Sequence, residues 1–168
     1  KITDQSDFEN LKSIYKSKQS VGIGFDVHRL VIGRKLFLAG LKIKSKLGTL
    51  GHSDGDPVLH SVTDAILGAC KMGDIGQMFS DKSKKFKNIS STILLKKVLN
   101  KISSYGYIIN NIDINIIAQR PKIKKHKNKM IHNISKICEI SKDQINIKGK
   151  TTEKLGVIGK EKAIATEV

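Results

Sequence analysis

The spacing of hydrophobic and polar positions changes several times along the chain. Residues 21–30, VGIGFDVHRL, alternate small or apolar residues with polar ones, and this period of two predicts a strand. Residues 35–43, KLFLAGLKI, predict a short hairpin that turns at Gly40. Residues 107–119, YIINNIDINIIAQ, alternate over a longer stretch and predict a long strand. Two closing strands are expected at 145–149 and 162–168.

Three other segments repeat their apolar residues with a helical period. The first helix is expected to begin at Asp56, because an aspartate can cap free amide groups and Pro57 suits the first helical position. It continues through residues 58–73. The second helix is expected at 91–106, and the third, which is basic, at 124–140.

Strands that alternate with helices predict an α+β fold with one mixed, four-stranded-type sheet and helices packed on one face. The 168 residues are enough for a single domain with a hydrophobic core, expected at 21–168 after a flexible N-terminal extension at 1–20. No apolar run approaches the roughly 20 residues of a membrane span, which indicates a soluble globular protein. Cys70 and Cys138 stand far apart and are expected to be free, buried thiols.

Positive charge dominates the composition, since 31 lysines and arginines face 15 acidic residues for a net charge of +16. This balance fits a nucleic-acid-binding protein or an enzyme with an anionic substrate. Only three of the basic residues are arginines and only 5% of residues are aromatic, whereas nucleic-acid binding draws on both types. Abundant isoleucine and asparagine accompany the lysines, which indicates a codon bias toward A and T. The charge alone therefore decides little.

Two short patterns suggest a metal site. Asp26 and His28 stand two apart on a predicted strand, so both side chains leave the same face of the sheet. His60 lies about one turn into the first predicted helix. Three such ligands would leave the fourth position of a tetrahedral zinc ion open, as in catalytic zinc sites. Asp64, one turn further along the same helix face, would fix the ring of His60, and His52 would be free for a phosphate oxygen.

A simpler alternative explains the same residues. Asp54 and Asp56 would then only cap the helix, and His60 would be a surface histidine with satisfied hydrogen bonds. A third pattern, KTTEKLG at 150–156, offers hydroxyls, lysines and the carboxylate of Glu153, which suits a diphosphate with a hard divalent cation. A polar surface loop explains that pattern equally well, and the basic run RPKIKKHKNK is typical of a solvated helix start.

Five motifs, taken together, resemble one enzyme family. SDGDPVLHSVTDAILG (53–68) is similar to the signature of the 2-C-methyl-D-erythritol 2,4-cyclodiphosphate synthases. The family's other motifs are resembled by GIGFDVHRL (22–30), GDIGQMFSD (73–81), IIAQRPK (116–122) and KTTEKLG (150–156), in the same order and at suitable spacing. The resemblance covers residues 21–168 and leaves only the N-terminal extension outside.

The resemblance implies a metal-dependent, cyclising phosphorus–oxygen lyase of the non-mevalonate route to isoprenoids. In that family the 2-phosphate of 4-diphosphocytidyl-2-C-methyl-D-erythritol 2-phosphate attacks the β-phosphorus of the diphosphate, closes the 2,4-cyclodiphosphate ring and expels CMP. Asp26, His28 and His60 would hold Zn²⁺, and Glu153 would hold a second ion, Mg²⁺ or Mn²⁺. Such a reaction needs positioning and charge neutralisation more than a protein nucleophile.

The resemblance also implies which residues contact the substrate. His52 and Thr151 would stabilise the charge of the transition state, with Ser53 as a further phosphate contact. The other positions match the ribose region (Asp74, Ile75, Gly76), the methylerythritol side (Phe79, Ser80, Asp81, Lys82, Ser83), the cytosine-binding stretch, which works largely through backbone groups (Ala118, Gln119, Arg120, Pro121, Lys122, Ile123, Lys124), and the remaining contacts (Asp26, Val27, His28, Lys150, Thr152, Glu153, Val157, Lys160).

Three of these positions depart from the usual family pattern. Ser80 stands where proline is common, Lys150 where threonine is frequent and Lys160 where arginine is frequent. A lysine cannot reproduce the planar fork of a guanidinium, so substrate contacts are expected to differ most at Lys160. None of the three is a proposed metal ligand.

The family is a homotrimer with a chorismate-mutase-like architecture and sites between subunits, and the same assembly is expected here. In eukaryotes the pathway lies in plastid-type organelles. The compartment is therefore expected to be an apicoplast, with a targeting sequence upstream of residue 1, or otherwise the cytoplasm of a bacterium. Neither nucleic acid nor a membrane is expected as a partner.

Two rival functions stay open. A zinc phosphodiesterase would use metal-bound water as its nucleophile and would need a general base that the sequence does not identify. A basic nucleic-acid-binding module would need no metal, and its affinity would fall steeply with salt.

Overall fold

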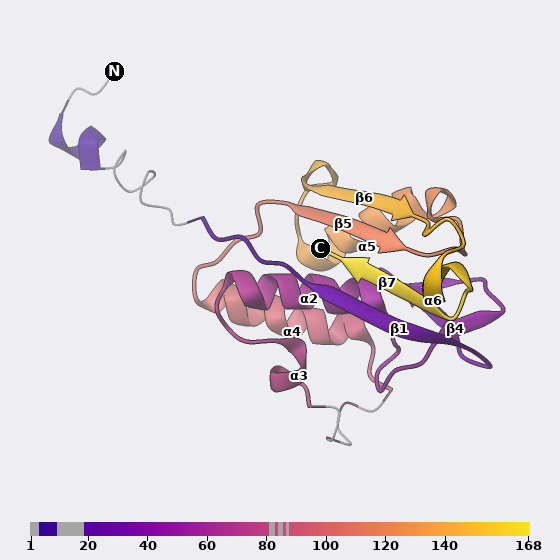
Figure 1. Cartoon of the computed structure of the whole chain (residues 1–168). Helices are drawn as coiled ribbons and strands as arrows, with labels where there is room; N and C mark the ends of the chain where they lie inside the picture. The colour runs from indigo at the N-terminus through magenta and orange to yellow at the C-terminus, as the bar shows by residue number, and fades with distance from the viewer. Residues whose placement is uncertain (1–3, 10–18, 81–82, 84–85, 87) are drawn as a thin grey trace.

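The structure, a computed structural model, describes residues 4–9, 19–80, 83, 86 and 88–168 (Figure 1). The main sheet has five strands in the order β4-β1-β7-β5-β6. β5 and β6 run parallel, and the other neighbouring pairs run antiparallel. The strands are β1 (Phe25–Ile32), β4 (Leu47–Thr49), β5 (Ile112–Ile117), β6 (Ile145–Lys150) and β7 (Ala163–Glu167), and a separate hairpin pairs β2 (Leu36–Leu38) with β3 (Leu41–Ile43).

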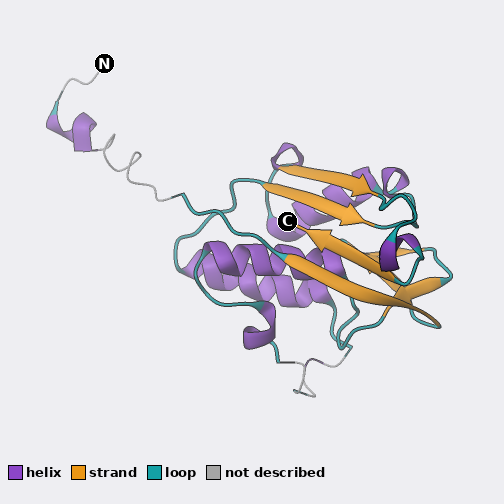
Figure 2. Ribbon diagram, in the orientation of Figure 1, coloured by secondary structure: helices purple, strands orange, loops and turns teal. Residues whose placement is uncertain are grey.

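Three long helices, α2 (Pro57–Ala69), α4 (Ser91–Ser104) and α5 (Lys127–Cys138), cover one face of this sheet (Figure 2). α2 packs against β1 and β7, α5 packs against β6, and α4 packs against both other helices. The shorter turns are α3 (Ile75–Met78), η2 (Ile123–Lys125), η3 (Lys142–Gln144) and α6 (Gly156–Gly159), and residues 5–9 are also helical. Within the described segments, no helix combines the length and apolarity that a bilayer crossing requires.

The predicted α+β fold with helices on one face is confirmed, but the sheet has five strands instead of the four expected. The additional strand is β4, which pairs with the end of β1. Its three residues are too few to show an alternating pattern. Some element boundaries also differ from those predicted. The strand predicted at 107–119 is shorter and corresponds to β5, and the helix predicted from Asp56 through 58–73 ends at Ala69. The helix predicted at 124–140 begins at Lys127, after the 3₁₀ turn η2.

Alternation along β5 and β6 separates a buried face of the sheet from an open one. Ile112, Ile114 and Ile116 on β5, with Ile145 and Ile147 on β6, are buried on the helix side. Burying one such side chain contributes roughly 1.5–3 kcal/mol relative to its exposed state. These residues therefore fix which face the helices cover.

The open face of the sheet carries both polar and apolar side chains. Asp113 on β5 pairs with Lys148 on β6 at 2.5 Å, and this pair is solvent-exposed. On β1, Phe25 and Val27 are 61% and 47% exposed. The predicted free thiols are confirmed on the other side, where Cys70 and Cys138 are unpaired and buried.

One buried carboxylate fixes the start of α2, at the predicted cap. Asp56 is fully buried, and its Oδ1 accepts hydrogen bonds from the backbone amides of Val58 and Leu59 at 3.0 and 3.1 Å. The same carboxylate accepts from the amides of Ala39 and Gly40 at 3.0 and 2.5 Å, in the turn between β2 and β3. Asp56 therefore ties the hairpin to the first turn of α2.

The segment that leads into β1 crosses α2 at backbone contact. A Cβ atom placed on Gly24 would lie 1.9 Å from the carbonyl oxygen of Ser61, and one placed on Gly22 would lie 1.8 Å from that of Ala65. Only glycine allows so close an approach. Beside this crossing, the buried hydroxyls of Ser61 and Thr166 lie 2.5 Å apart and join α2 to β7.

Gly24→Ala is expected to destabilise the protein by about 2 kcal/mol or more, because the new methyl group meets backbone atoms that cannot move aside. Gly68→Ala on α2 is the matched control. Its Cβ would find no atom closer than 3.9 Å, so the helix should gain up to about 1 kcal/mol. Urea unfolding measures both free energies. Equal stability of Gly24→Ala and the parent protein would contradict the close crossing.

Candidate functional site

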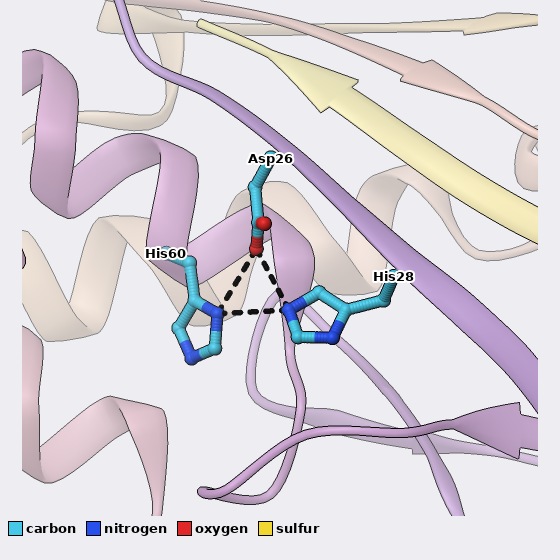
Figure 3. Close-up of side chains that lie close together, drawn as sticks. All are labelled: Asp26, His28 and His60. Carbon is cyan, nitrogen blue, oxygen red and sulfur yellow. Dashed lines mark hydrogen bonds and ion pairs between the residues drawn. The ribbon is translucent and has the colours of Figure 1, made fainter. Parts of the chain in front are cut away.

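β1 and α2 bring the three predicted metal ligands together (Figure 3). Asp26 and His28 stand two apart on β1, opposite Thr166 and Ile164 of β7, so both side chains face the helix layer. His60 lies in the first turn of α2 and points back toward the strand. Residues 32 positions apart in the sequence thus meet at one point.

The three ligand atoms form a nearly equilateral triangle. Asp26 Oδ2 lies 2.9 Å from His28 Nε2 and 3.0 Å from His60 Nδ1, and the two nitrogens are 3.2 Å apart. Edges of about 3.3 Å are expected when a tetrahedral ion binds its ligands at about 2.0–2.1 Å. Among the described residues, no other group of three or more histidines, cysteines and acidic residues gathers its ligand atoms this closely. The geometry suits one metal ion with an open coordination position.

Protonation of the histidines competes with a metal at this triangle. Burial raises the pKa of Asp26, but hydrogen bonds and positive charge from the protonated rings of His28 and His60 outweigh this effect and lower the pKa to about 2. Burial is the largest single effect on the pKa of His28 and lowers it. The hydrogen bond and charge of Asp26, the carbonyl of Leu50 and the charge of Asp56 together outweigh burial, so the net shift is upward. A metal must displace protons from the rings, so its affinity falls as the pH falls.

Each of the two histidines makes a further hydrogen bond that orients its ring. His28 Nδ1 lies 2.7 Å from the carbonyl oxygen of Leu50. A carbonyl can only accept, so Nδ1 donates. In the neutral ring, the form that binds a metal, Nε2 then keeps its lone pair toward Asp26. His60 Nε2 lies 3.0 Å from Ser53 Oγ and 2.9 Å from Ser91 Oγ.

The orienting role expected for Asp64 falls to other residues. Asp64 Oδ1 accepts a hydrogen bond from the amide of Ile75 at 2.7 Å, at the start of α3, and no described hydrogen bond joins Asp64 to His60. The ring is held instead by the two serines, of which Ser91 is not predicted from the sequence. Asp54, predicted only as a cap of α2, accepts from the amide of Ser91 at 3.0 Å.

Three predicted substrate contacts turn away from the open side of the metal ligands. Ser53 is buried, and its hydroxyl faces His60. Val27 points to the open face of the sheet, opposite to the metal ligands of β1, so its backbone alone borders the site. Phe79 is buried and packs edge-to-face on Phe86, with 5.4 Å between ring centroids, which makes it a core residue.

Other predicted contacts on this side are open to solvent. His52 is exposed, and its Nε2 lies 3.3 Å from the carbonyl oxygen of Ser83. Asp74 caps α3 by accepting from the amide of Gln77 at 2.8 Å. Asp74, Gly76 and Ser80 are exposed, Ile75 is half-buried, and Asp81 and Lys82 lie outside the described residues.

A cavity of about 420 Å³ collects a second set of predicted residues. It is lined by Ala118, Pro121, Lys122, Ile123, Lys124, Lys150 and Thr151, all predicted, and by Lys127, Ile147, Lys148 and Gly149, which are not. Five of the lining residues are lysines and none is acidic. Lys148 pairs with Asp113, and the remaining lysines suit the cavity to an anionic ligand. At Gly149 a Cβ atom would lie 2.8 Å from Cβ of Ile123, so glycine keeps this wall open.

The turn after β6 holds Thr151 and Glu153 together. The Thr151 hydroxyl donates to Glu153 Oε1 at 2.6 Å, and the exposed Glu153 carboxylate belongs to no group of metal-type ligands within the described residues. The remaining predicted contacts lie nearby in the sequence. The buried Oε1 of Gln119 has no hydrogen-bond partner among the described residues, and Arg120 pairs with Glu161 at 3.2 Å. Thr152 donates to the carbonyl of Leu155, and Val157 and Lys160 are exposed.

The metal ligands and the cavity occupy different parts of the chain. The ligands lie between β1 and α2, whereas the cavity is built from the segment after β5, η2, the start of α5 and the end of β6. β7 and β5 separate β1 from β6 in the sheet. Figure 1 shows the turn after β6 beside α6, at the edge of the molecule, and α3 below the long helices. One chain thus carries the metal ligands and the cavity at two separate places.

Comparisons with known proteins agree on the family. A family model described as the YgbB family matches residues 19–168. The bifunctional enzyme IspD/IspF of Pelagibacter ubique is 66% identical over 168 residues, which are 100% of this chain and 44% of that protein. The chain therefore spans less than half the length of this bifunctional relative.

Two further relatives match most of their own length. The 2-C-methyl-D-erythritol 2,4-cyclodiphosphate synthase of Bacteroides fragilis is 49% identical over 148 residues, which are 88% of this chain and 93% of that protein. The solved structure of IspF from Plasmodium falciparum, a CDP complex, has a TM-score of 0.78 at 42% identity and covers 88% of this chain and 91% of that one. The chain therefore belongs to the YgbB family, that of the 2-C-methyl-D-erythritol 2,4-cyclodiphosphate synthases, as its five motifs predict.

Proposed function

We propose that the protein converts 4-diphosphocytidyl-2-C-methyl-D-erythritol 2-phosphate into 2-C-methyl-D-erythritol 2,4-cyclodiphosphate and CMP, as a step of isoprenoid precursor synthesis. The observation that carries the proposal is the Asp26–His28–His60 triangle, with its three ligand atoms and open position. Membership of the family and the name of the Bacteroides relative support it. The cyclic product keeps the 2-phosphate and the β-phosphate of the substrate, and the α-phosphate leaves in CMP.

The reaction is an intramolecular phosphoryl transfer. An oxygen of the 2-phosphate forms a bond to the β-phosphorus, and the bond from that phosphorus to the oxygen shared with the α-phosphate breaks. The electron pair leaves with CMP. Zn²⁺ held by Asp26, His28 and His60 would supply a Lewis acid for a phosphate oxygen. The chain itself must hold the reacting groups in line and offset their charge.

The turn after β6 would serve the diphosphate. Glu153 is proposed to hold Mg²⁺ or Mn²⁺, with phosphate oxygens as further ligands. The hydrogen bond from Thr151 keeps both side chains at this turn. Thr151 from this side and the exposed His52 from the metal side would donate to the oxygens on which charge develops.

The lysine-lined cavity would hold the cytidine and its phosphate. Its volume of about 420 Å³ falls within the range of small-ligand sites, roughly 300–1,000 Å³. The CDP complex of the Plasmodium relative supports a cytidine nucleotide as ligand. Of the positions that depart from the family pattern, Lys160 would keep the positive charge of the usual arginine and Lys150 would add one, both beside the proposed phosphates.

The separation of the metal ligands from the cavity supports a homotrimer with a chorismate-mutase-like architecture. A site formed between subunits would join the metal ligands of one chain to the cavity of the next. The exposed Phe25 and Val27 give the open face of the sheet an apolar surface suited to a subunit contact. A homotrimer would therefore bury the sheet face that the helices leave open.

The two rival functions fit the structure less well. A phosphodiesterase would need a general base beside the metal. Among the described residues, the side chains outside the triangle that hydrogen-bond to His60 are the hydroxyls of Ser53 and Ser91. A nucleic-acid-binding module leaves the metal triangle without a role.

The compartment stays a prediction. The reported curated relatives are bacterial proteins, which favours a bacterial source over a plastid.

His60→Ala is expected to abolish zinc retention and turnover, since two ligands hold the ion far more weakly than three. His132→Ala, at an exposed histidine of α5, is the control and should keep both. Metal analysis after dialysis and gel filtration measures zinc per chain and assembly. Activity of metal-stripped His60→Ala would contradict the proposed site.

Glu153→Gln is expected to keep zinc but to lower the rate of CMP release at least tenfold, because a neutral amide is a poor ligand for Mg²⁺ or Mn²⁺. Glu139→Gln, at the exposed C-terminal end of α5, is the control. Chromatography follows CMP, and ³¹P NMR identifies the cyclic diphosphate. CMP released with an open-chain product would establish the hydrolase, and no loss of rate in Glu153→Gln would remove the second metal from Glu153.

A further inference from the structure

The metal triangle is connected to α4 by a chain of buried hydrogen bonds. His60 Nε2, the ring nitrogen that points away from Asp26, lies 2.9 Å from Ser91 Oγ. The Ser91 hydroxyl donates to Asp54 Oδ1, and the Ser91 amide donates to Asp54 Oδ2 at 3.0 Å. Ser91 is 1% exposed, so water does not replace these bonds. Ser53, 7% exposed, lies 3.0 Å from the same ring nitrogen.

The chemistry of the groups fixes the direction of every proton in this chain. A carboxylate can only accept, so the Ser91 hydroxyl proton points to Asp54. The Ser91 oxygen is then an acceptor toward His60, and Nε2 must carry the ring proton. A neutral imidazole carries one proton, so Nδ1 is left with its lone pair toward Asp26 and His28.

The two histidines reach the same result with different partners. His28 is oriented by the backbone carbonyl of Leu50, which no substitution removes. His60 depends on side chains. Asp54 accepts the Ser91 hydroxyl proton, and the Ser91 oxygen therefore accepts the proton on His60 Nε2. The Ser53 hydroxyl oxygen accepts a hydrogen bond from the amide of Gly55 at 3.2 Å and can also accept the proton on His60 Nε2. Among the described hydrogen bonds, none joins Ser53 to a carboxylate.

We infer that Asp54 and Ser91 are positioning residues that hold His60 in the tautomer needed for metal binding. The inference rests on the proposed metal site and deepens it. Hydrogen-bond partners of metal-binding histidines typically change metal affinity by about 10–100-fold when they are removed. Asp54 thereby serves the metal ion without contacting it, in addition to its bond to the first amide of α4.

Ser91→Ala and Asp54→Asn test the chain from its two ends. Ser91→Ala removes the acceptor of the His60 proton. Asp54→Asn keeps the shape but cannot accept from both the amide and the hydroxyl of Ser91, and an Asn amino group facing Ser91 Oγ would reverse the hydroxyl toward His60. Ser103→Ala, at an exposed position on the same helix, is the control.

Competition with a chelator measures the zinc affinity of the full chain, with circular dichroism to confirm folding. Each single variant is expected to bind zinc about 10–100-fold more weakly, and Ser103→Ala should match the parent. The double variant should be no weaker than the weaker single variant, because both substitutions break one chain. If the fold-losses of zinc affinity in the two single variants multiply in the double variant, the substitutions act independently and the inference is overturned. Unchanged zinc affinity in Ser91→Ala would also overturn it.

A second measurement separates positioning from packing. In the zinc-loaded protein, ¹⁵N NMR of the imidazole rings should show zinc on His60 Nδ1 and a proton on Nε2 that exchanges slowly with water, and the exchange should accelerate in Ser91→Ala. Coordination through Nε2 would overturn the inference. Zinc binding with this tautomer but no CMP release would refute the proposed reaction and leave the positioning role intact, whereas a parent protein that binds no zinc would refute both.

Discussion

The close crossing of β1 over α2 is the constraint on which the site depends. Gly24 allows the strand to approach the carbonyl of Ser61, and the ligands follow directly, with Asp26 two residues after the glycine and His60 one residue before the serine. A wider crossing would move the strand ligands away from the helix ligand by more than a metal–ligand bond tolerates. The hydroxyl pair of Ser61 and Thr166 holds the helix on β7 as well, so both neighbouring strands fix its position.

The metal ligands could be predicted because each depends on a local rule. Alternation in a strand places Asp26 and His28 on one face, and the cap at Asp56 sets where the helix begins and therefore where His60 points. The partners of those ligands follow no local rule. Asp64 lies on the expected side of α2, but a free amide at the start of α3 is its nearer partner. Ser91 reaches His60 from a different helix, and no periodicity relates the two.

The difference between features set by a local sequence rule and features set by distant contacts also explains the other elements. The long helices and the hairpin turn at Gly40 carry clear signals over many residues. β4 has three residues, and its place at the sheet edge is set by pairing with β1. Val27 and Phe79 were predicted from motifs, which mark a segment but not the direction of each side chain. Lys127 and Lys148 join the cavity only because α5 and β6 pack together.

The separation of the metal ligands from the lysine-lined cavity would have a genetic consequence in the proposed homotrimer. If each complete site is formed by two subunits, a chain that lacks the metal ligands still contributes an intact lysine-lined cavity, and a chain with a damaged cavity still contributes its metal ligands. Two defective copies of the gene, altered in different halves, would then restore some working sites when expressed together. Two copies altered in the same half would restore none. The pattern of complementation would therefore map the halves of the site without any knowledge of the structure.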